Sequence, residues 1–171
     1  MEKAENIRIA GIIRESIVDG PGIRFVIFCQ GCPHGCPGCH NPESHDFNGG
    51  YDCSTDRILE EIDKNPLLKG VTFSGGEPMC KAKEFSYLAE EIKKRGLDLV
   101  VFTGYTYEKL IEENDPDRMK LLEFTDLLID GPYLKDQRDL TLRFRGSRNQ
   151  RIIDISKTEK KGEPVLAEEY M

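Results

Sequence analysis

The sequence lacks any long uninterrupted hydrophobic run. No stretch approaches the roughly 20 apolar residues of a membrane-spanning helix, and no apolar segment follows a basic start at the N-terminus. Basic residues are also in deficit: 24 lysines and arginines face 31 aspartates and glutamates, for a net charge of -7. An acidic chain of this kind is a poor general binder of nucleic acid or of anionic membranes. We therefore predict a cytoplasmic protein that has neither nucleic acid nor membrane as a partner.

The chain also has no internal repeat, low-complexity block or obvious linker. Its 171 residues are most simply one domain, and they are enough to bury a hydrophobic core. We place this domain at residues 1–156. Residues 157–171 are rich in charge, and we expect them to form a loosely held tail.

Short β-branched and aromatic runs alternate with amphipathic helical patterns. Strands are expected at residues 7–13, 23–29, 70–74, 97–102, 127–129 and 151–155, and helices at residues 55–64, 81–95 and 116–124, with a further short helix after Thr106. This alternation predicts an α/β fold with a mostly parallel open sheet and right-handed crossovers. A closed eight-unit barrel takes roughly 250 residues, so the chain can form only a partial (β/α) barrel.

Three of the six cysteines lie in one short loop, and no obvious fourth ligand accompanies them. Cys32, Cys36 and Cys39 follow the spacing C-x3-C-x2-C, and each stands next to glycine or proline. Structural zinc sites and ordinary iron–sulfur carriers usually close their coordination with four protein ligands. Three clustered thiolates therefore favour an iron–sulfur cluster with one iron left open for a substrate or cosubstrate. The alternative is a non-catalytic zinc or iron–sulfur binding module.

The other three cysteines are expected to be small buried or half-buried side chains. Cys53 and Cys80 are isolated, and Cys29 ends an apolar run that reads as a strand. Cys29 and Cys32 also form a C-x2-C pair, which leaves open a four-ligand site that includes Cys29. A disulfide framework is disfavoured, because the chain is large and shows no secretion signal.

A glycine-rich turn follows the strand expected at residues 70–74. Gly75 and Gly76 can expose backbone groups to a ligand at close range, and Glu77 adds a carboxylate able to bind an ammonium group. Parallel sheets bind ligands at the carboxyl ends of their strands. We therefore expect one mouth to be lined by four loops, which contain the cysteines, the Gly-Gly-Glu-Pro turn, residues 103–105 and residues 130–132.

The cysteine spacing together with Gly75-Gly76-Glu77-Pro78 resembles the radical S-adenosylmethionine superfamily. The resemblance implies that the three cysteines bind a four-iron four-sulfur (4Fe-4S) cluster. It implies that the open iron binds the amino and carboxylate groups of S-adenosylmethionine. One electron from the cluster then cleaves the S–C bond and gives a 5'-deoxyadenosyl radical, which abstracts hydrogen. The fold implied is the partial barrel of this superfamily.

Longer stretches are similar to glycyl-radical enzyme activases, namely residues 19–25, 30–42, 103–105 and 128–133. Residues 143–151 resemble one branch, the activating proteins of anaerobic ribonucleoside-triphosphate reductase, and the similarity covers about residues 6–153. The resemblance implies an oxidoreductase that takes an electron from a flavodoxin-type donor. Its product is a glycyl radical on the large reductase subunit. The enzyme alternatives are an activase of another glycyl-radical enzyme and a small radical enzyme that acts on a free metabolite.

The resemblance also implies roles for single residues. It implies no catalytic side chain, because the cluster and S-adenosylmethionine carry out the chemistry. The implied metal ligands are Cys32, Cys36 and Cys39, and the implied contacts to S-adenosylmethionine come from Gly38, Cys39, His40, Asn41, Gly75, Gly76 and Glu77. Gly38 and His40 would touch its nucleoside part, and the Gly-Gly-Glu turn its methionine end. Many activases carry Asp-x-Lys at the strand end where this chain has Pro132. A contact from that lysine is therefore missing or comes from elsewhere.

Two further groups of residues can be interpreted either as ordinary loop or surface residues or as functional ones. His34 and His45 are expected to be ordinary loop residues, although a neutral imidazole can bind metal. An arginine-rich stretch stands out in the acidic chain: Arg138, Arg143, Arg145, Arg148 and Arg151. It is either a solvated face or a contact surface for the partner reductase.

Overall fold

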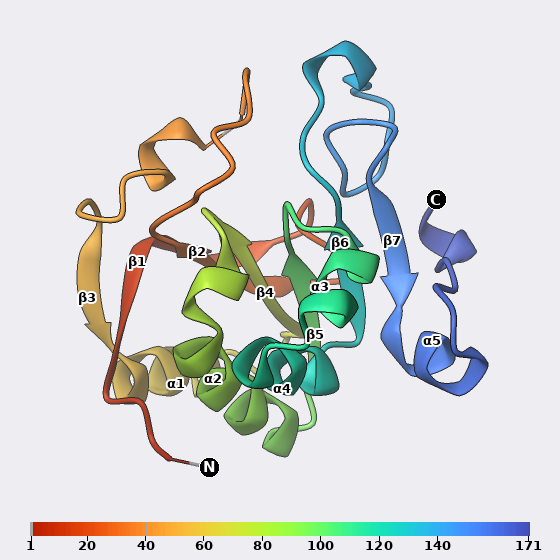
Figure 1. Cartoon of the computed structure of the whole chain (residues 1–171). Helices are drawn as coiled ribbons and strands as arrows, with labels where there is room; N and C mark the ends of the chain where they lie inside the picture. Colours follow the sequence, from red (N-terminus) through yellow and green to blue (C-terminus); the bar gives the residue numbers. More distant parts are fainter. Residues whose placement is uncertain (1, 40) are drawn as a thin grey trace.

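A seven-stranded sheet forms the centre of the protein, in the order β3-β1-β2-β4-β5-β6-β7 (Figure 1). The structure is a computed structural model and describes residues 2–39 and 41–171. The strands are β1 (Asn6–Ser16), β2 (Arg24–Cys29), β3 (Tyr51–Ser54), β4 (Gly70–Gly75), β5 (Asp98–Phe102), β6 (Leu127–Asp130) and β7 (Arg151–Asp154). The four central strands β2, β4, β5 and β6 pair in parallel, whereas β1, β3 and β7 add antiparallel pairings at the two sides. The predicted α/β fold with an open, largely parallel sheet is confirmed.

The helices start and bury their faces largely as the sequence patterns predict. They are α1 (Thr55–Asp63), α2 (Ala82–Lys94), α3 (Tyr107–Glu113), α4 (Pro116–Phe124) and α5 (Ile155–Lys161), with 3-10 helices η1 (Pro42–Ser44), η2 (Pro78–Lys81), η3 (Lys135–Gln137) and η4 (Glu168–Tyr170). The hydroxyl groups of Ser54 and Thr106 accept backbone hydrogen bonds and begin α1 and α3. None of the helices in residues 2–39 and 41–171 is long and apolar enough to cross a membrane.

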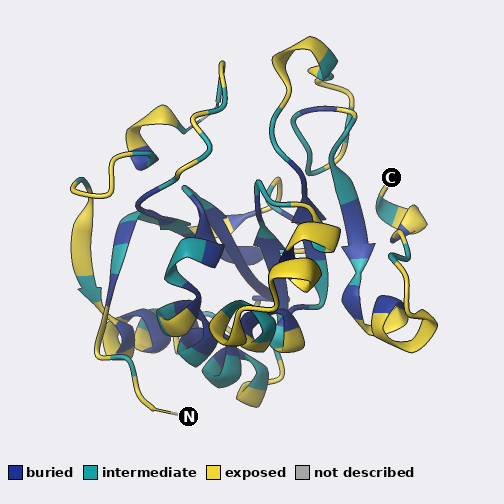
Figure 2. Cartoon of the chain, in the orientation of Figure 1, coloured by how far each residue is buried: buried dark blue, intermediate teal, exposed yellow. Residues whose placement is uncertain are grey.

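Alternate residues of the central strands pack into two hydrophobic clusters. The larger cluster lies between the sheet and α1, α2 and α4, and it includes Phe73 on β4, Phe85 on α2 and Val101 on β5. The smaller cluster takes Val100 of β5 together with Ile129, Ile152 and Ala167. Figure 2 shows the central strands as the most continuously buried part of the chain. A sheet covered in this way gives the strand ends a rigid base.

The side chain of Arg24 ties the amino-terminal ends of three neighbouring strands together. It is 0% exposed, and its Nη2 lies 2.6 Å from Asp98 Oδ1 at the start of β5. Its Nε donates to Thr72 Oγ1 at 2.8 Å, and its remaining donors reach the carbonyl oxygens of Pro21 and Val71. A buried guanidinium is tolerated here because its donors are paired with acceptors.

Two features differ from the sequence prediction. Strand β3 was not predicted, since it is short and mostly exposed, and it pairs with the outer edge of β1. The expectation of a loosely held tail is wrong: Val165 N donates to Thr158 Oγ1, and Ala167 N donates to the carbonyl oxygen of Ile152 on β7. Main-chain pairing of this kind does not depend on a hydrophobic pattern. Figure 1 shows α5 and the C-terminus beside β7.

Replacement of Arg24 by methionine should lower the free energy of unfolding by about 3 kcal/mol or more, because three buried oxygens lose their donor and the carboxylate of Asp98 loses its ion-pair partner. Arg14→Met is the matched control, since the Arg14 side chain is 70% exposed and its ion pair with Glu61 lies at the surface. That change should cost less than about 1 kcal/mol. Urea unfolding followed by circular dichroism measures both values, and equal losses would contradict the buried role of Arg24.

Candidate functional site

A cavity of about 750 Å³ opens at the carboxyl ends of the parallel strands. Its walls come from the loops that follow β2, β4, β5 and β6, and they include Cys32, Cys36, Cys39, Asn41, Gly75, Gly76, Thr103, Gly104, Gly131 and Tyr133. The four loops that the sequence placed at one mouth therefore do meet there. The volume lies within the range of ordinary small-molecule sites.

The three thiols of the cysteine loop, residues 31–42, all face this cavity. Cys32, Cys36 and Cys39 are free and half-buried. Cys39 N donates to Cys36 O at 3.1 Å, and Asn41 N donates to Cys39 Sγ at 3.5 Å, so the loop turns tightly around the thiols. Burial raises the pKa of the Cys32 thiol to about 11.

The donor set fits a multi-iron cluster. Among the described residues, no three His, Cys, Asp or Glu side chains are grouped closely enough to hold a single metal ion. In an iron–sulfur cluster each thiolate binds its own iron, so the ligands need not converge on one point. Three free thiols around one cavity suit that requirement, and no fourth cysteine lines the cavity among the residues that the structure describes.

The Gly-Gly-Glu turn is bonded directly to the base of the cysteine loop. Gly76 N donates to Cys29 O, and Glu77 N donates to Gly31 O, both at 2.8 Å. A Cβ atom at Gly75, whose φ is +89°, would lie 2.6 Å from Cys29 N, and one at Gly76 would collide with Gly31 O. The two glycines therefore allow close approach of the protein's own backbone, and they also line the cavity.

The carboxylate of Glu77 lies beneath the cavity wall. Glu77 is 0% exposed and is not among the described residues that line the cavity. Its Oε1 accepts from Gly104 N at 2.7 Å and from Thr103 Oγ1 at 3.0 Å, and its Oε2 accepts from Met79 N at 3.0 Å. This position differs from the expectation that Glu77 faces the ammonium group of a ligand, since the oxygens are already engaged by protein donors.

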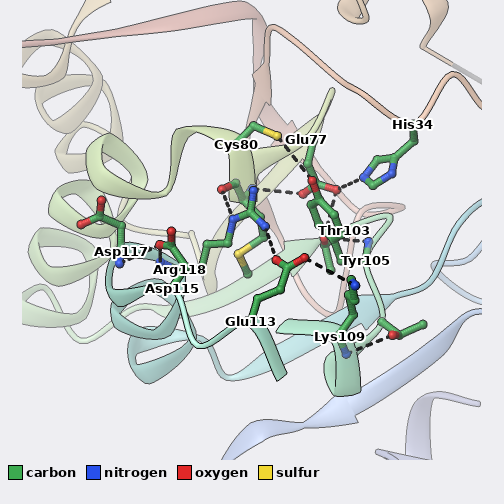
Figure 3. A network of polar contacts seen from close by, with 12 residues as sticks. His34, Glu77, Cys80, Thr103, Tyr105, Lys109, Glu113, Asp115, Asp117 and Arg118 are labelled. Carbon is green, nitrogen blue, oxygen red and sulfur yellow. Dashed lines mark hydrogen bonds and ion pairs between the residues drawn. The ribbon is translucent and has the colours of Figure 1, made fainter. Parts of the chain in front are cut away.

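His34 joins the cysteine loop to this carboxylate. It lies between Cys32 and Cys36, and its Nε2 is 2.6 Å from Glu77 Oε1 (Figure 3). The imidazole meets the ring of Tyr105 edge-on, at 4.6 Å between centroids. His34 does lie in a loop, as expected, but its hydrogen bond to the buried Glu77 was not predicted. The signal for its role is tertiary, because it depends on which donors surround the buried Glu77.

The remaining predicted residues divide between the cavity and its surroundings. Asn41 lines the cavity. A Cβ atom at Gly38 would lie 3.4 Å from the side chain of Lys135 and 3.5 Å from that of Tyr133, both after β6. His40 lies outside the described residues. Cys29 is fully buried at the end of β2, where burial raises its pKa, and Cys53 and Cys80 are half-buried away from the cavity, as expected.

The arginine-rich stretch contains residues of different kinds. Arg151 pairs through Nε and Nη2 with the buried carboxylate of Asp130 at 3.0 and 2.6 Å, so it stabilises the end of β6. These hydrogen bonds raise the pKa of the Arg151 guanidinium. Arg145 lines the cavity. The other three arginines of the stretch are exposed: Arg138, Arg143 and Arg148.

Replacement of Glu77 by alanine should lower the free energy of unfolding by at least about 3 kcal/mol, because the variant leaves several buried donors without an acceptor. Glu163→Ala serves as the control, since the Glu163 side chain is 63% exposed and pairs with Lys161 at the surface. Urea denaturation of both variants gives the comparison. A loss at Glu77 as small as the loss at Glu163 would show that its hydrogen bonds contribute little.

Comparison with known proteins agrees with the predicted family. A model of a 4Fe-4S single cluster domain matches residues 18–153. The chain is 33% identical over 144 residues to the anaerobic ribonucleoside-triphosphate reductase-activating protein of Vibrio cholerae, covering 80% of this chain and 90% of that protein. The proteins of the same name from Escherichia coli K12 and bacteriophage T4 are 32% and 33% identical, over 78% and 79% of this chain and 90% and 86% of those proteins.

Among solved structures, QueE from Escherichia coli is similar with a TM-score of 0.46 at 19% identity, over 59% of this chain and 53% of that one. So distant a likeness adds nothing to the assignment, which rests on the cluster-domain match and on the relatives that align along most of both chains. The chain belongs to the 4Fe-4S single cluster domain family, among the anaerobic ribonucleoside-triphosphate reductase-activating proteins.

Proposed function

We propose that this protein generates a glycyl radical on the large subunit of an anaerobic ribonucleoside-triphosphate reductase. The observation that carries the proposal is the set of three free thiols on one cavity, in a chain whose relatives are activating proteins of that reductase. An electron donor of the flavodoxin type would complete the reaction. Because the target would be a loop of another protein, the cavity beside the cluster needs to be open to the surface.

Cys32, Cys36 and Cys39 would each bind one iron of a 4Fe-4S cluster. When bound, the cluster would supply the electron that cleaves S-adenosylmethionine, whose amino and carboxylate groups would occupy the remaining iron. Gly75, Gly76 and Asn41 line the cavity beside the thiols and would contact this ligand, with further contacts from Gly38 and His40. Glu77 would act indirectly, by fixing the turn and the cysteine loop.

The rim of the cavity is suited to a protein substrate. Val18 and Leu140 both line the cavity, yet they are 70% and 80% exposed. Ile17, beside Val18, is 73% exposed. Large apolar side chains left in water around a cavity are typical of surfaces that another protein covers. A loop of the reductase that carries the target glycine would cover them.

The proposal is tested by electron paramagnetic resonance under anaerobic conditions. The reconstituted protein is mixed with dithionite, S-adenosylmethionine and the candidate reductase, and a glycyl doublet should appear on the reductase. Cleavage of S-adenosylmethionine without a doublet would leave the radical chemistry intact and would remove the reductase as partner. A protein with neither cleavage nor cluster would contradict the whole proposal.

Single cysteine substitutions test the ligand assignment. Reconstituted wild-type protein should hold about four iron and four sulfide ions per chain, whereas Cys32→Ala, Cys36→Ala and Cys39→Ala should each lose most of them. Cys53→Ala and Cys80→Ala are the matched controls and should keep the wild-type content. Tetrahedral zinc without sulfide would instead favour a non-catalytic module. Loss of the cluster from a control variant would show that the ligand set is wrong.

Two substitutions at His34 test whether its hydrogen bond to Glu77 positions the cysteine loop. His34→Gln keeps a donor near the carboxylate, and His34→Phe keeps a ring beside Tyr105 but has no donor. We expect a chelator to remove iron from the Phe variant about tenfold faster than from the Gln variant, which is the scale of effects from groups that orient ligands. The decay of the visible absorbance measures both rates. Equal rates would show that the hydrogen bond is not what holds the loop.

A further inference from the structure

Arg145 is the only lysine or arginine among the described residues that line the cavity. Its Nη1 donates to Gln150 O and its Nε to Arg143 O, both at 3.3 Å, so its hydrogen bonds end on main-chain carbonyls. The cavity also holds one carboxylate, Asp19, but that group accepts from Ser16 Oγ at 2.6 Å. Arg145 therefore brings a positive charge to the cavity without a carboxylate bound to it.

The positive charge of Arg145 is less compensated by nearby carboxylates than that of Arg151. Two carboxylates hold Arg151, and hydrogen bonds to them raise its pKa. Burial instead lowers the pKa of Arg145, and only a weaker attraction from Asp139 opposes that effect. An anion that entered the cavity would supply the missing compensation.

The amide side chains of Asn149 and Gln150 hold the segment that carries Arg145 in place. Gln150 Oε1 accepts from Gly146 N at 2.9 Å and from Ser147 N at 3.1 Å, and its Nε2 donates to Gly131 O at 3.1 Å. Asn149 Nδ2 donates to Pro132 O at 2.7 Å. These bonds tie the segment to the end of β6, the strand end at which Pro132 offers no charge of its own.

The residue before Arg145 adopts an uncommon backbone conformation. Phe144 has a φ of +58°, in the left-handed region that a non-glycine side chain rarely adopts. Such a conformation is strained, and it persists only where its surroundings enforce it. Phe144 and Arg145 both line the cavity, so the strained position coincides with the wall that carries the cation.

We propose that Arg145 binds the carboxylate of an amino-acid moiety in this cavity. The inference rests on the proposed function, in which that ligand is S-adenosylmethionine. A carboxylate has two oxygens that accept hydrogen bonds, and a guanidinium can donate to both of them in parallel. Arg145 thereby fixes the orientation of the methionine end within the cavity.

The affinities of the reconstituted protein for two ligands distinguish recognition of the carboxylate by Arg145 from a general effect on ligand binding. S-adenosylmethionine carries the carboxylate, and its decarboxylated analogue does not. Arg145→Met should raise the dissociation constant of S-adenosylmethionine about tenfold or more, the scale of a hydrogen bond to a charged group, and should leave that of the analogue nearly unchanged. Arg148→Met is the matched control, because Arg148 is exposed and does not line the cavity. Equilibrium dialysis at equal iron content measures all the constants.

Three other outcomes would overturn the assignment of Arg145 to the ligand carboxylate. Equal weakening of both ligands would overturn the assignment, because the effect would not depend on the carboxylate. Unchanged binding of both ligands, with loss of reductase from a pull-down, would assign Arg145 to the partner and overturn it as well. A wild-type protein that holds a cluster but binds no S-adenosylmethionine would remove the proposed function itself, and this inference with it.

Discussion

The buried carboxylate of Glu77 is the interaction on which the site depends. The side chain of Glu77 is 0% exposed, and the protein donors that satisfy its oxygens come from three segments that are far apart in the sequence. Met79 belongs to its own turn, Gly104 follows β5, and His34 lies inside the cysteine loop. One carboxylate therefore fixes two strand ends and the loop of thiols relative to one another.

The central sheet could be predicted because its strands are buried on both faces. Such strands read as short apolar runs, and β2, β4 and β5 lie within one or two residues of the predicted ranges. The edges could not be predicted in the same way. Strand β3 and the segment around Ala167 are held by main-chain hydrogen bonds to a neighbouring strand, and such bonds leave no hydrophobic pattern in the sequence.

The same distinction holds for the site: features set by local sequence could be predicted, and features set by distant partners could not. That Cys32, Cys36 and Cys39 lie at the cavity could be predicted, because their spacing is local and parallel strands end at a common edge. The roles of His34 and Glu77 could not, because each depends on a partner more than 40 positions away. The arginine-rich stretch is the intermediate case: its charge is visible in the sequence, but only the fold separates Arg151, which holds Asp130, from Arg145, which faces the cavity.

In the proposed enzyme, three protein thiols leave one position of the cluster open for a ligand. Mössbauer spectroscopy of protein reconstituted with iron-57 tests it most directly, because ligands of different kinds give iron sites with different parameters. About one quarter of the iron signal should differ from the rest, and only that portion should change when S-adenosylmethionine is added. Four equivalent sites that do not respond to S-adenosylmethionine would contradict the account.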